Sequence, residues 1–302
     1  IHDPFLCLAL AAEHTARLEV GPAIAVAFGR SPLVVAHTAW DLAAASRGRF
    51  ILGLGTQVRG HIERRFGMQW EAPASRMREF IGALRAIWRA WQERTPLRFE
   101  GRHYTHTLMT PFFDPGPQPF PRIPTYLAAV TLPMLRVAGE VCDGVHVHPL
   151  HSVRFLREVV RPTVARGAEQ AGRSPEAVAL AVPAFVATGA TPGEVEQAAA
   201  AVRQRIAFYA STKTYRSVMD LHGWSDAAQR LRKLSIEGKW EAMGAVITDE
   251  MFAEFAVAAT HADVPGRLRA KYAGLVVRLM LYLPYPGDAP EEFWRGVAAL
   301  KN

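Results

Sequence analysis

The chain has 302 residues, of which half are hydrophobic and 21% are charged, the balance of an ordinary globular protein. Its 35 Lys and Arg against 28 Asp and Glu give a net charge of +7, but the basic residues are scattered, which argues against a polybasic tail and a nucleic-acid partner. No apolar run reaches the ~18 residues of a spanning helix. Cys7 and Cys142 are the only cysteines and lie in apolar segments, so we expect a reducing cytoplasm without a disulfide framework or cysteine-based zinc site.

The first elements predicted are helices that alternate with strands. Asp3 followed by Pro4 is typical of a helix N-terminus, and predicts a helix over residues 4–16. A β-branched stretch predicts a strand over residues 18–26, which Gly21 and Pro22 kink or bulge. A second helix is expected over residues 32–46.

Residues 50–55 are all apolar or glycine and do not alternate with polar residues, which is typical of a strand buried on both faces of a parallel sheet. Thr56, Gln57 and Arg59 follow it. Because ligands in such folds lie beyond the carboxyl ends of the strands, Gly55 to Arg59 form a candidate site wall. A βα turn that needs Gly only for its shape is the alternative.

The remaining chain continues the alternation of strands and helices. Apolar residues at three- and four-residue spacing predict an amphipathic helix over residues 74–92, and Gly101 turns a two-stranded excursion that starts at residue 97. Strands are then expected over residues 123–130, 143–148, 178–188 and 275–283, and helices over 132–141 (capped by Thr131), 152–171, 192–210 and 290–300, with broken helix over 211–260. This order implies parallel strands with right-handed crossovers, in an open doubly wound sheet or a barrel.

Common nucleotide motifs are absent. Gly53 and Gly55 do not begin a dinucleotide fingerprint, because the third glycine would fall on Val58, and the sequence shows no P-loop lysine pattern.

Several polar or small residues at strand ends are candidates for binding. His146, His148 and His151 could bind a metal, contact a ligand or be half-buried structural residues, and the absence of an acidic neighbour speaks against a metal. The segment Ala128–Ala129–Val130–Thr131 joins a strand to a helix N-terminus, where backbone N–H groups bind phosphate, or simply packs helix on strand. His2 is a candidate proton-transfer residue, although a terminal His beside an N-cap Asp explains the pair without catalysis and is the favoured interpretation.

The whole chain resembles the bacterial luciferase-like superfamily, in particular its F420-dependent, methylenetetrahydromethanopterin reductase-like branch. The segments that carry the resemblance are His2–Leu6, Ala11–Thr15, Gly21–Ala25, Gly48–Thr56, Met109–Phe113 and Ala138–Gly144.

The resemblance implies a TIM-type (β/α)8 barrel with coenzyme F420 at the carboxyl ends of its strands. Ala23 and Ile24 then match a bulge, often with a non-prolyl cis peptide, that backs the deazaflavin ring. Gly55, Thr56 and Gln57 match the loop beside the cofactor, and Ala128, Ala129, Val130 and Thr131 match the turn that receives its phosphate. His148 lies near a further contact point of the family, and no metal is implied.

We therefore expect one barrel domain over residues 1–302, with an inserted excursion around 97–121 and a helical insertion around 211–260. On the family pattern, the first strand, its helix and most of the second strand precede the equivalent of His2, so the barrel is expected to be N-terminally incomplete and the parent protein longer.

The expected activity is hydride transfer between F420 and an organic small-molecule substrate. An FMN-dependent monooxygenase and a non-catalytic barrel that serves as a binding subunit are the alternatives. A homodimer is compatible with the sequence, and no membrane partner is expected.

Overall fold

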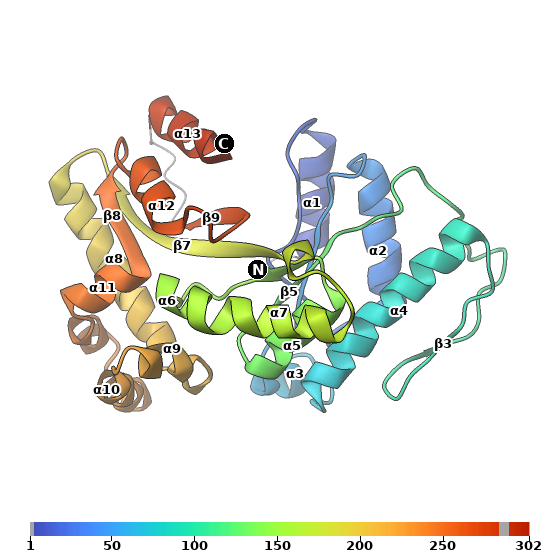
Figure 1. Cartoon of the computed structure of the whole chain (residues 1–302), viewed down its shortest axis with the longest axis horizontal. Coiled ribbons are helices and arrows are strands. Elements are labelled where there is room, and N and C mark those ends of the chain that lie inside the picture. The colour runs from blue at the N-terminus through green and yellow to red at the C-terminus, as the bar shows by residue number, and fades with distance from the viewer. Residues whose placement is uncertain (1–2, 284–289, 302) are drawn as a thin grey trace. The chain divides into compact units, whose positions relative to one another are not determined.

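The computed structural model describes residues 3–283 and 290–301, and the chain divides into two compact units (Figure 1). The first unit comprises residues 1–146 and 163–179, and the second comprises residues 147–162 and 180–302. Each unit contains parallel strands and helices, which confirms the predicted α/β class.

The first unit contains a parallel sheet with the strand order β1-β2-β5-β6. Its strands are β1 (Ala25–Val26), β2 (Leu52–Gly55), β5 (Thr125–Ala128) and β6 (Gly144–His146). Val26 pairs with Gly55, and Ala128 pairs with His146, so the carboxyl ends of the strands lie at one level. This edge of the sheet is where a parallel fold places its ligand.

The two faces of this sheet differ in side-chain size. Leu52, Leu54, Leu127 and Val145 share one face through their pairing and are fully inaccessible to solvent. The opposite face carries the alternate residues, which are mostly small: Gly53, Gly55, Tyr126, Ala128, Gly144 and His146. The apolar face thus anchors the sheet in the core, while the glycines of the other face let Pro22, Ile24, Tyr126 and His146 approach the backbone closely.

The helices of the first unit are α1 (Pro4–Glu13), α2 (Pro32–Ala45), α3 (Arg59–Arg64), α4 (Pro73–Glu93), α5 (Leu132–Val141) and α7 (Arg161–Gln170), with a 3-10 turn at Pro175–Ala177. Helices α1, α2, α4 and α5 begin within a residue of the predicted positions, whereas α3 was not predicted and α7 is the later part of the helix predicted over residues 152–171. The Asp3 carboxylate accepts a hydrogen bond from the Phe5 N–H at 2.9 Å, and the Ser31 hydroxyl oxygen accepts one from the Leu33 N–H at 3.2 Å. These side chains cap α1 and α2, whose first helical residues are prolines.

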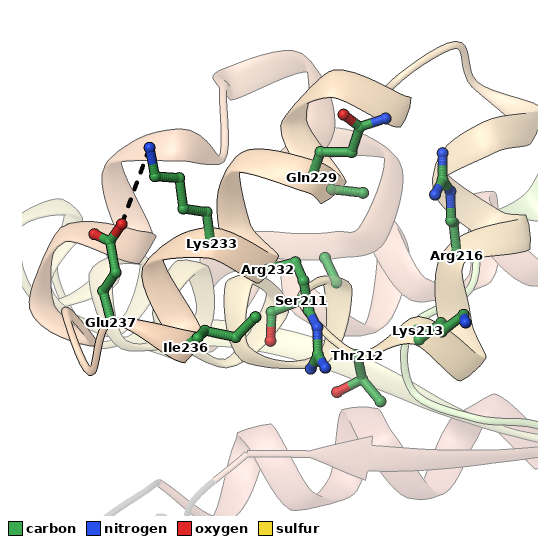
Figure 2. Close-up of a pocket in the computed structure, with 11 residues that line it drawn as sticks. Ser211, Thr212, Lys213, Arg216, Gln229, Arg232, Lys233, Ile236 and Glu237 are labelled. Carbon is green, nitrogen blue, oxygen red and sulfur yellow. Dashed lines mark ion pairs between the residues drawn. The ribbon is translucent and has the colours of Figure 1, made fainter.

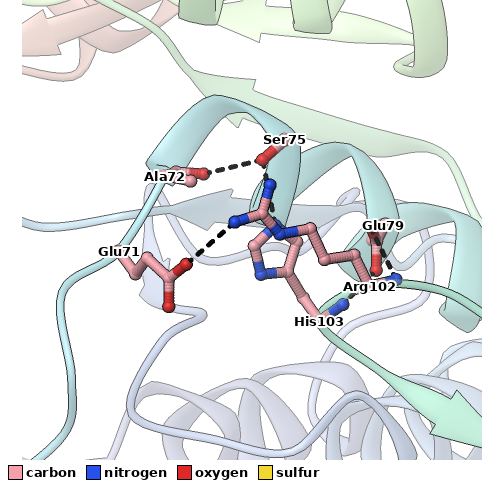
Figure 3. A network of polar contacts seen from close by, with 6 residues as sticks. All are labelled: Glu71, Ala72, Ser75, Glu79, Arg102 and His103. Carbon is pink, nitrogen blue, oxygen red and sulfur yellow. Dashed lines mark hydrogen bonds and ion pairs between the residues drawn. The ribbon is translucent and has the colours of Figure 1, made fainter.

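The predicted excursion is a hairpin held against α4. Strands β3 (Phe99–Glu100) and β4 (Thr105–His106) pair antiparallel, and the Gly101 N–H donates to the Tyr104 carbonyl at 2.9 Å. The Glu79 carboxylate on α4 accepts hydrogen bonds from the backbone N–H groups of Arg102 at 3.1 Å and His103 at 2.7 Å (Figure 3). One carboxylate on a rigid helix therefore fixes the turn.

The second unit is built on the long strand β7 (Ala179–Gly189), which pairs in parallel with β8 (Ala256–Thr260) and β9 (Arg278–Tyr282). Its other elements are α6 (Val153–Phe155), a π-turn at Leu156–Val160, α8 (Pro192–Ala210), η3 (Lys213–Tyr215), α9 (Arg216–Leu221), α10 (Ser225–Ile236), η4 (Glu241–Val246), α11 (Asp249–Phe255), α12 (Val264–Tyr272), α13 (Glu291–Ala298) and η5 (Ala299–Lys301).

Four predictions need correction. The strand over residues 18–26 is reduced to β1 and a single bridge between Val20 and Phe50, because Pro22 has no N–H to continue the ladder. The broken helix over residues 211–260 ends in strand β8, whose Ala- and Val-rich residues follow α11 without a Gly or Pro break. The helix predicted over residues 152–171 is interrupted by a short π-helix at Leu156–Val160. Thr131 makes no side-chain capping hydrogen bond to α5.

Within the part of the chain that the structure describes, no helix has both the length and the apolar character needed to cross a lipid bilayer.

Candidate functional site

Three strand ends of the first unit meet at small residues. A Cβ atom added to Gly55 would lie 2.7 Å from Ile24 Cδ1 and 3.4 Å from Ala128 Cβ. Ile24, Gly55 and Ala128 are therefore neighbours. The peptide bond between Ala23 and Ile24 is cis, the geometry that the resemblance implied for this bulge.

Gly53 precedes Gly55 by two residues in β2 and therefore lies on the same face of the sheet. Its missing side chain admits the Pro22 carbonyl oxygen, which would be 1.8 Å from an added Cβ, and His146 Nε2, which would be 2.8 Å away. The His146 ring lies 5.3 Å from the Tyr126 ring, centroid to centroid. The groups next to Gly53 are thus the Pro22 backbone and the His146 imidazole, which lies beside the Tyr126 phenol.

The loop after β2 holds its own shape through Gln57. The Thr56 hydroxyl donates to the Gln57 carbonyl at 2.9 Å, and the Val58 N–H donates to Gln57 Oε1 at 3.0 Å. Gln57 has a φ of 61°, in the left-handed region. These contacts keep the half-buried Thr56 and Gln57 beside the end of β2.

The segment from Ala128 to Thr131 leads directly into α5. Ala129 is buried, whereas Ala128 and Val130 are half-buried and Thr131 is exposed. Since no side chain caps α5, the N–H groups of its first turn remain for an external acceptor. Small side chains, open N–H groups and the positive end of the helix dipole fit a phosphate-bearing cofactor.

His148 belongs to the second unit, where aromatic rings surround it. Its ring stacks on Tyr215 at 3.8 Å and meets the Tyr209 ring edge-on at 4.7 Å, centroid to centroid. Burial lowers the pKa of His148 to about 3, so the ring is neutral at physiological pH. Because Nδ1 accepts a hydrogen bond from the Leu150 N–H at 3.1 Å, the proton lies on Nε2. His148 is thus a neutral hydrogen-bond donor.

The three neighbouring histidines have different surroundings. His146 lies in the first unit, whereas His148 and His151 lie in the second. The His151 ring is fully buried, contacts the Tyr272 hydroxyl at 3.1 Å, and has a pKa lowered to about 4 by burial. Within residues 3–283 and 290–301, no group of three or more His, Cys, Asp or Glu side chains is arranged to bind a metal ion.

The beginning of the chain gives a structural role to Asp3. Its carboxylate caps α1 and forms an ion pair with Arg30, and that pairing lowers the pKa of Asp3. His2, the predicted catalytic residue, lies outside the described residues.

Sequence reasoning did not select the aromatic partners of these sites. Tyr126 lies inside a buried strand and reads as core, and Tyr209 and Tyr215 are far from His148 in the chain. One pattern in the sequence could have indicated Tyr126. Side chains alternate between the two faces of a strand, so Tyr126 lies on the same face as Ala128 in β5.

Comparison with known proteins assigns the family. The family model described as luciferase-like monooxygenase matches residues 1–279, so the chain belongs to the luciferase-like family of oxidoreductases, as predicted. An uncharacterized protein of Mycobacterium tuberculosis is 52% identical over 279 residues, covering 92% of this chain and 82% of the relative. The 5,10-methylenetetrahydromethanopterin reductase of Archaeoglobus fulgidus is 27% identical, covering 86% of this chain and 75% of the relative.

Solved structures show the same fold. The F420-dependent tetrahydromethanopterin reductase from Methanopyrus kandleri has a TM-score of 0.76 at 20% identity, covering 99% of this chain and 86% of its own. The EDTA monooxygenase of Chelativorans has a TM-score of 0.75 at 17% identity, covering 99% and 77%. The predicted luciferase-like TIM-barrel fold is thereby confirmed.

Proposed function

We propose that this protein is an F420-dependent oxidoreductase that transfers a hydride between the deazaflavin ring and an organic substrate. The observation that carries the proposal is the meeting of Ile24, Gly55 and Ala128 on the small-residue face of the sheet. It is supported by the methylenetetrahydromethanopterin reductases among the relatives.

Each strand end has a part in holding the cofactor. Ala23 and Ile24 back the ring, Gly55, Thr56 and Gln57 flank it, and Ala128, Ala129, Val130 and Thr131 receive the phosphate. When bound, the deazaflavin supplies the hydride chemistry, while the protein binds, orients and shields it.

Two histidines have further proposed roles. His148 presents its Nε2–H as a neutral donor to the cofactor, a role that its low pKa keeps constant across physiological pH. His2 transfers a proton or contacts the substrate. We expect a small-molecule substrate and a cytoplasmic enzyme, with a homodimer as the candidate assembly.

FMN-dependent monooxygenation is the second candidate. The matching family model is described as a monooxygenase, and the EDTA monooxygenase has the same fold at a similar TM-score. The same small-residue face would then hold the FMN isoalloxazine ring.

Fluorescence titration of the purified protein with F420 and, separately, with FMN tests both functions. The proposal predicts saturable quenching by F420 and much weaker binding of FMN. The reverse order would favour the monooxygenase, and binding of neither would overturn both. If F420 binds but no compound in a panel of alcohols, ketones and imines changes its redox state, the result favours a non-catalytic binding subunit.

A further inference from the structure

A cavity lies in the second unit, and none of the residues proposed above for cofactor binding lines it. It has a volume of about 380 Å³ and lies among the end of α8, η3, α9 and α10 (Figure 2). That volume is within the range of about 300–1,000 Å³ found for small-molecule sites.

The charged residues of this cavity are mostly basic. Lys213, Arg216, Arg232 and Lys233 line it, with Glu237 as the single acidic residue. They come from η3, α9 and α10, so separate elements bring like charges to one cavity. All four side chains are exposed, so water screens their mutual repulsion, but together they give the cavity a positive potential.

Two of these cations are available to a ligand. Arg216 lies 3.3 Å from Asp220, and Lys233 lies 4.0 Å from Glu237. The side chains of Lys213 and Arg232, by contrast, form no hydrogen bond or ion pair with any residue that the structure describes. In Figure 2, Arg232 extends toward Ser211 and Thr212, whereas Lys233 points toward Glu237. The free guanidinium and ammonium groups thus border the same space as two hydroxyls.

The rest of the lining fits a molecule with an apolar part as well as an anionic group. Ala210, Ala228 and Ile236 give apolar contacts, and the Gln229 amide adds a donor. Ser211 is buried, and because its hydroxyl donates to the Phe208 carbonyl at 2.7 Å, its proton is not available to an anion. Polar and apolar side chains therefore line the same cavity.

We propose that this cavity binds the phosphate group of a small phosphorylated molecule. A guanidinium and an ammonium group that approach from different elements match the tetrahedrally arranged oxygens of a phosphate, whereas a planar carboxylate is matched by one Arg fork. The apolar lining then contacts the organic part of the molecule.

Isothermal titration calorimetry with pyrophosphate, on the full chain without redox cofactor and at low salt, tests the proposal. We expect saturable binding that Arg232→Gln weakens by about tenfold, the effect of losing one charge-assisted hydrogen bond. Arg230→Gln is the matched control, because Arg230 is exposed on the same helix and does not line the cavity. It removes the same charge and should leave the affinity unchanged.

Two results would overturn the proposal. One is the absence of saturable pyrophosphate binding, and the other is an equal loss in Arg230→Gln and Arg232→Gln, which would indicate only general electrostatic attraction. Citrate serves as the carboxylate probe, and binding as tight as that of pyrophosphate would also overturn the phosphate assignment. Circular dichroism of each variant verifies that the exposed substitutions leave the fold intact.

Discussion

Gly53 makes the close approach of two backbone segments possible at the candidate site. An added Cβ would be 1.8 Å from the Pro22 carbonyl oxygen, which belongs to backbone and cannot rotate away. We expect Gly53→Ala to lower the free energy of unfolding by about 1–3 kcal/mol, the usual effect of overpacking. Gly60→Ala is the control, since nothing lies within 4 Å of its added Cβ. Chemical denaturation measures both, and equal stabilities would contradict the geometry.

Arg49 joins the end of α1 to the start of β2. Its guanidinium donates to the carbonyls of Ala12 at 2.9 Å, Thr15 at 2.8 Å and Leu18 at 2.6 Å. A lysine keeps the charge but cannot form this fork of hydrogen bonds. Arg49→Lys should therefore lower the free energy of unfolding by about 2 kcal/mol.

The control for Arg49 is Arg17→Lys, an exposed position where the change should remain within about 0.5 kcal/mol. Thermal and urea denaturation compare the two variants. A stability of Arg49→Lys within that same margin would show that charge alone, without the fork, holds the segment.

At the scale of elements, the Glu79 carboxylate is the group of α4 that binds the backbone of the hairpin turn, beside the side-chain contacts of Ser75 with His103 and of Arg76 with Tyr104. Glu79→Gln keeps the size of the side chain but weakens its acceptance of the Arg102 and His103 N–H groups. We expect amide hydrogen exchange to accelerate several-fold across β3 and β4. Glu71→Gln is the matched control, because Glu71 pairs only with the exposed Arg102 side chain at 3.4 Å. Equal exchange in both variants would refute the role of Glu79.

Most elements could be predicted because local signals agreed with tertiary packing. The apolar spacing of α4 and the cap-plus-proline starts of α1 and α2 are properties of neighbouring residues. Strand β8 could not be predicted in the same way, because its pairing with β7 is a long-range contact. For Thr131, a suitable residue type at the right position did not guarantee a capping hydrogen bond.

The candidate site shows the same limit. The small residues at positions 55 and 128 were visible in the sequence, and the family resemblance indicated the bulge at Ala23–Ile24. Their contact depends on strand order and register, which place Val26 beside Gly55 and Leu54 beside Leu127. The stacking of Tyr215 on His148 joins residues that no periodic pattern connects.

At the scale of the whole molecule, the buried histidines predict how stability changes with pH. The pKa values of His148 and His151 are about 3 and about 4, below the ~6.5 of an unfolded chain. The unfolded state therefore binds more protons below pH ~6.5, and stability should fall as pH decreases from there toward 4. His148→Phe, which keeps a ring but cannot titrate, should flatten this decline in denaturation curves. A slope identical to that of the wild type would contradict the assignment.

The small-residue face of the first unit is proposed to hold the deazaflavin ring, and the dissociation constant of F420 for Ala128→Leu tests this most directly. Ala128 is half-buried beside Gly55, so a leucine there would occupy the space proposed for the ring. We predict a dissociation constant raised at least about tenfold, equivalent to ~1.4 kcal/mol, with an unchanged melting temperature. The control Ala258→Leu, at an exposed position in β8, should leave the dissociation constant unchanged. Undiminished F420 binding by Ala128→Leu would contradict the proposed cofactor site.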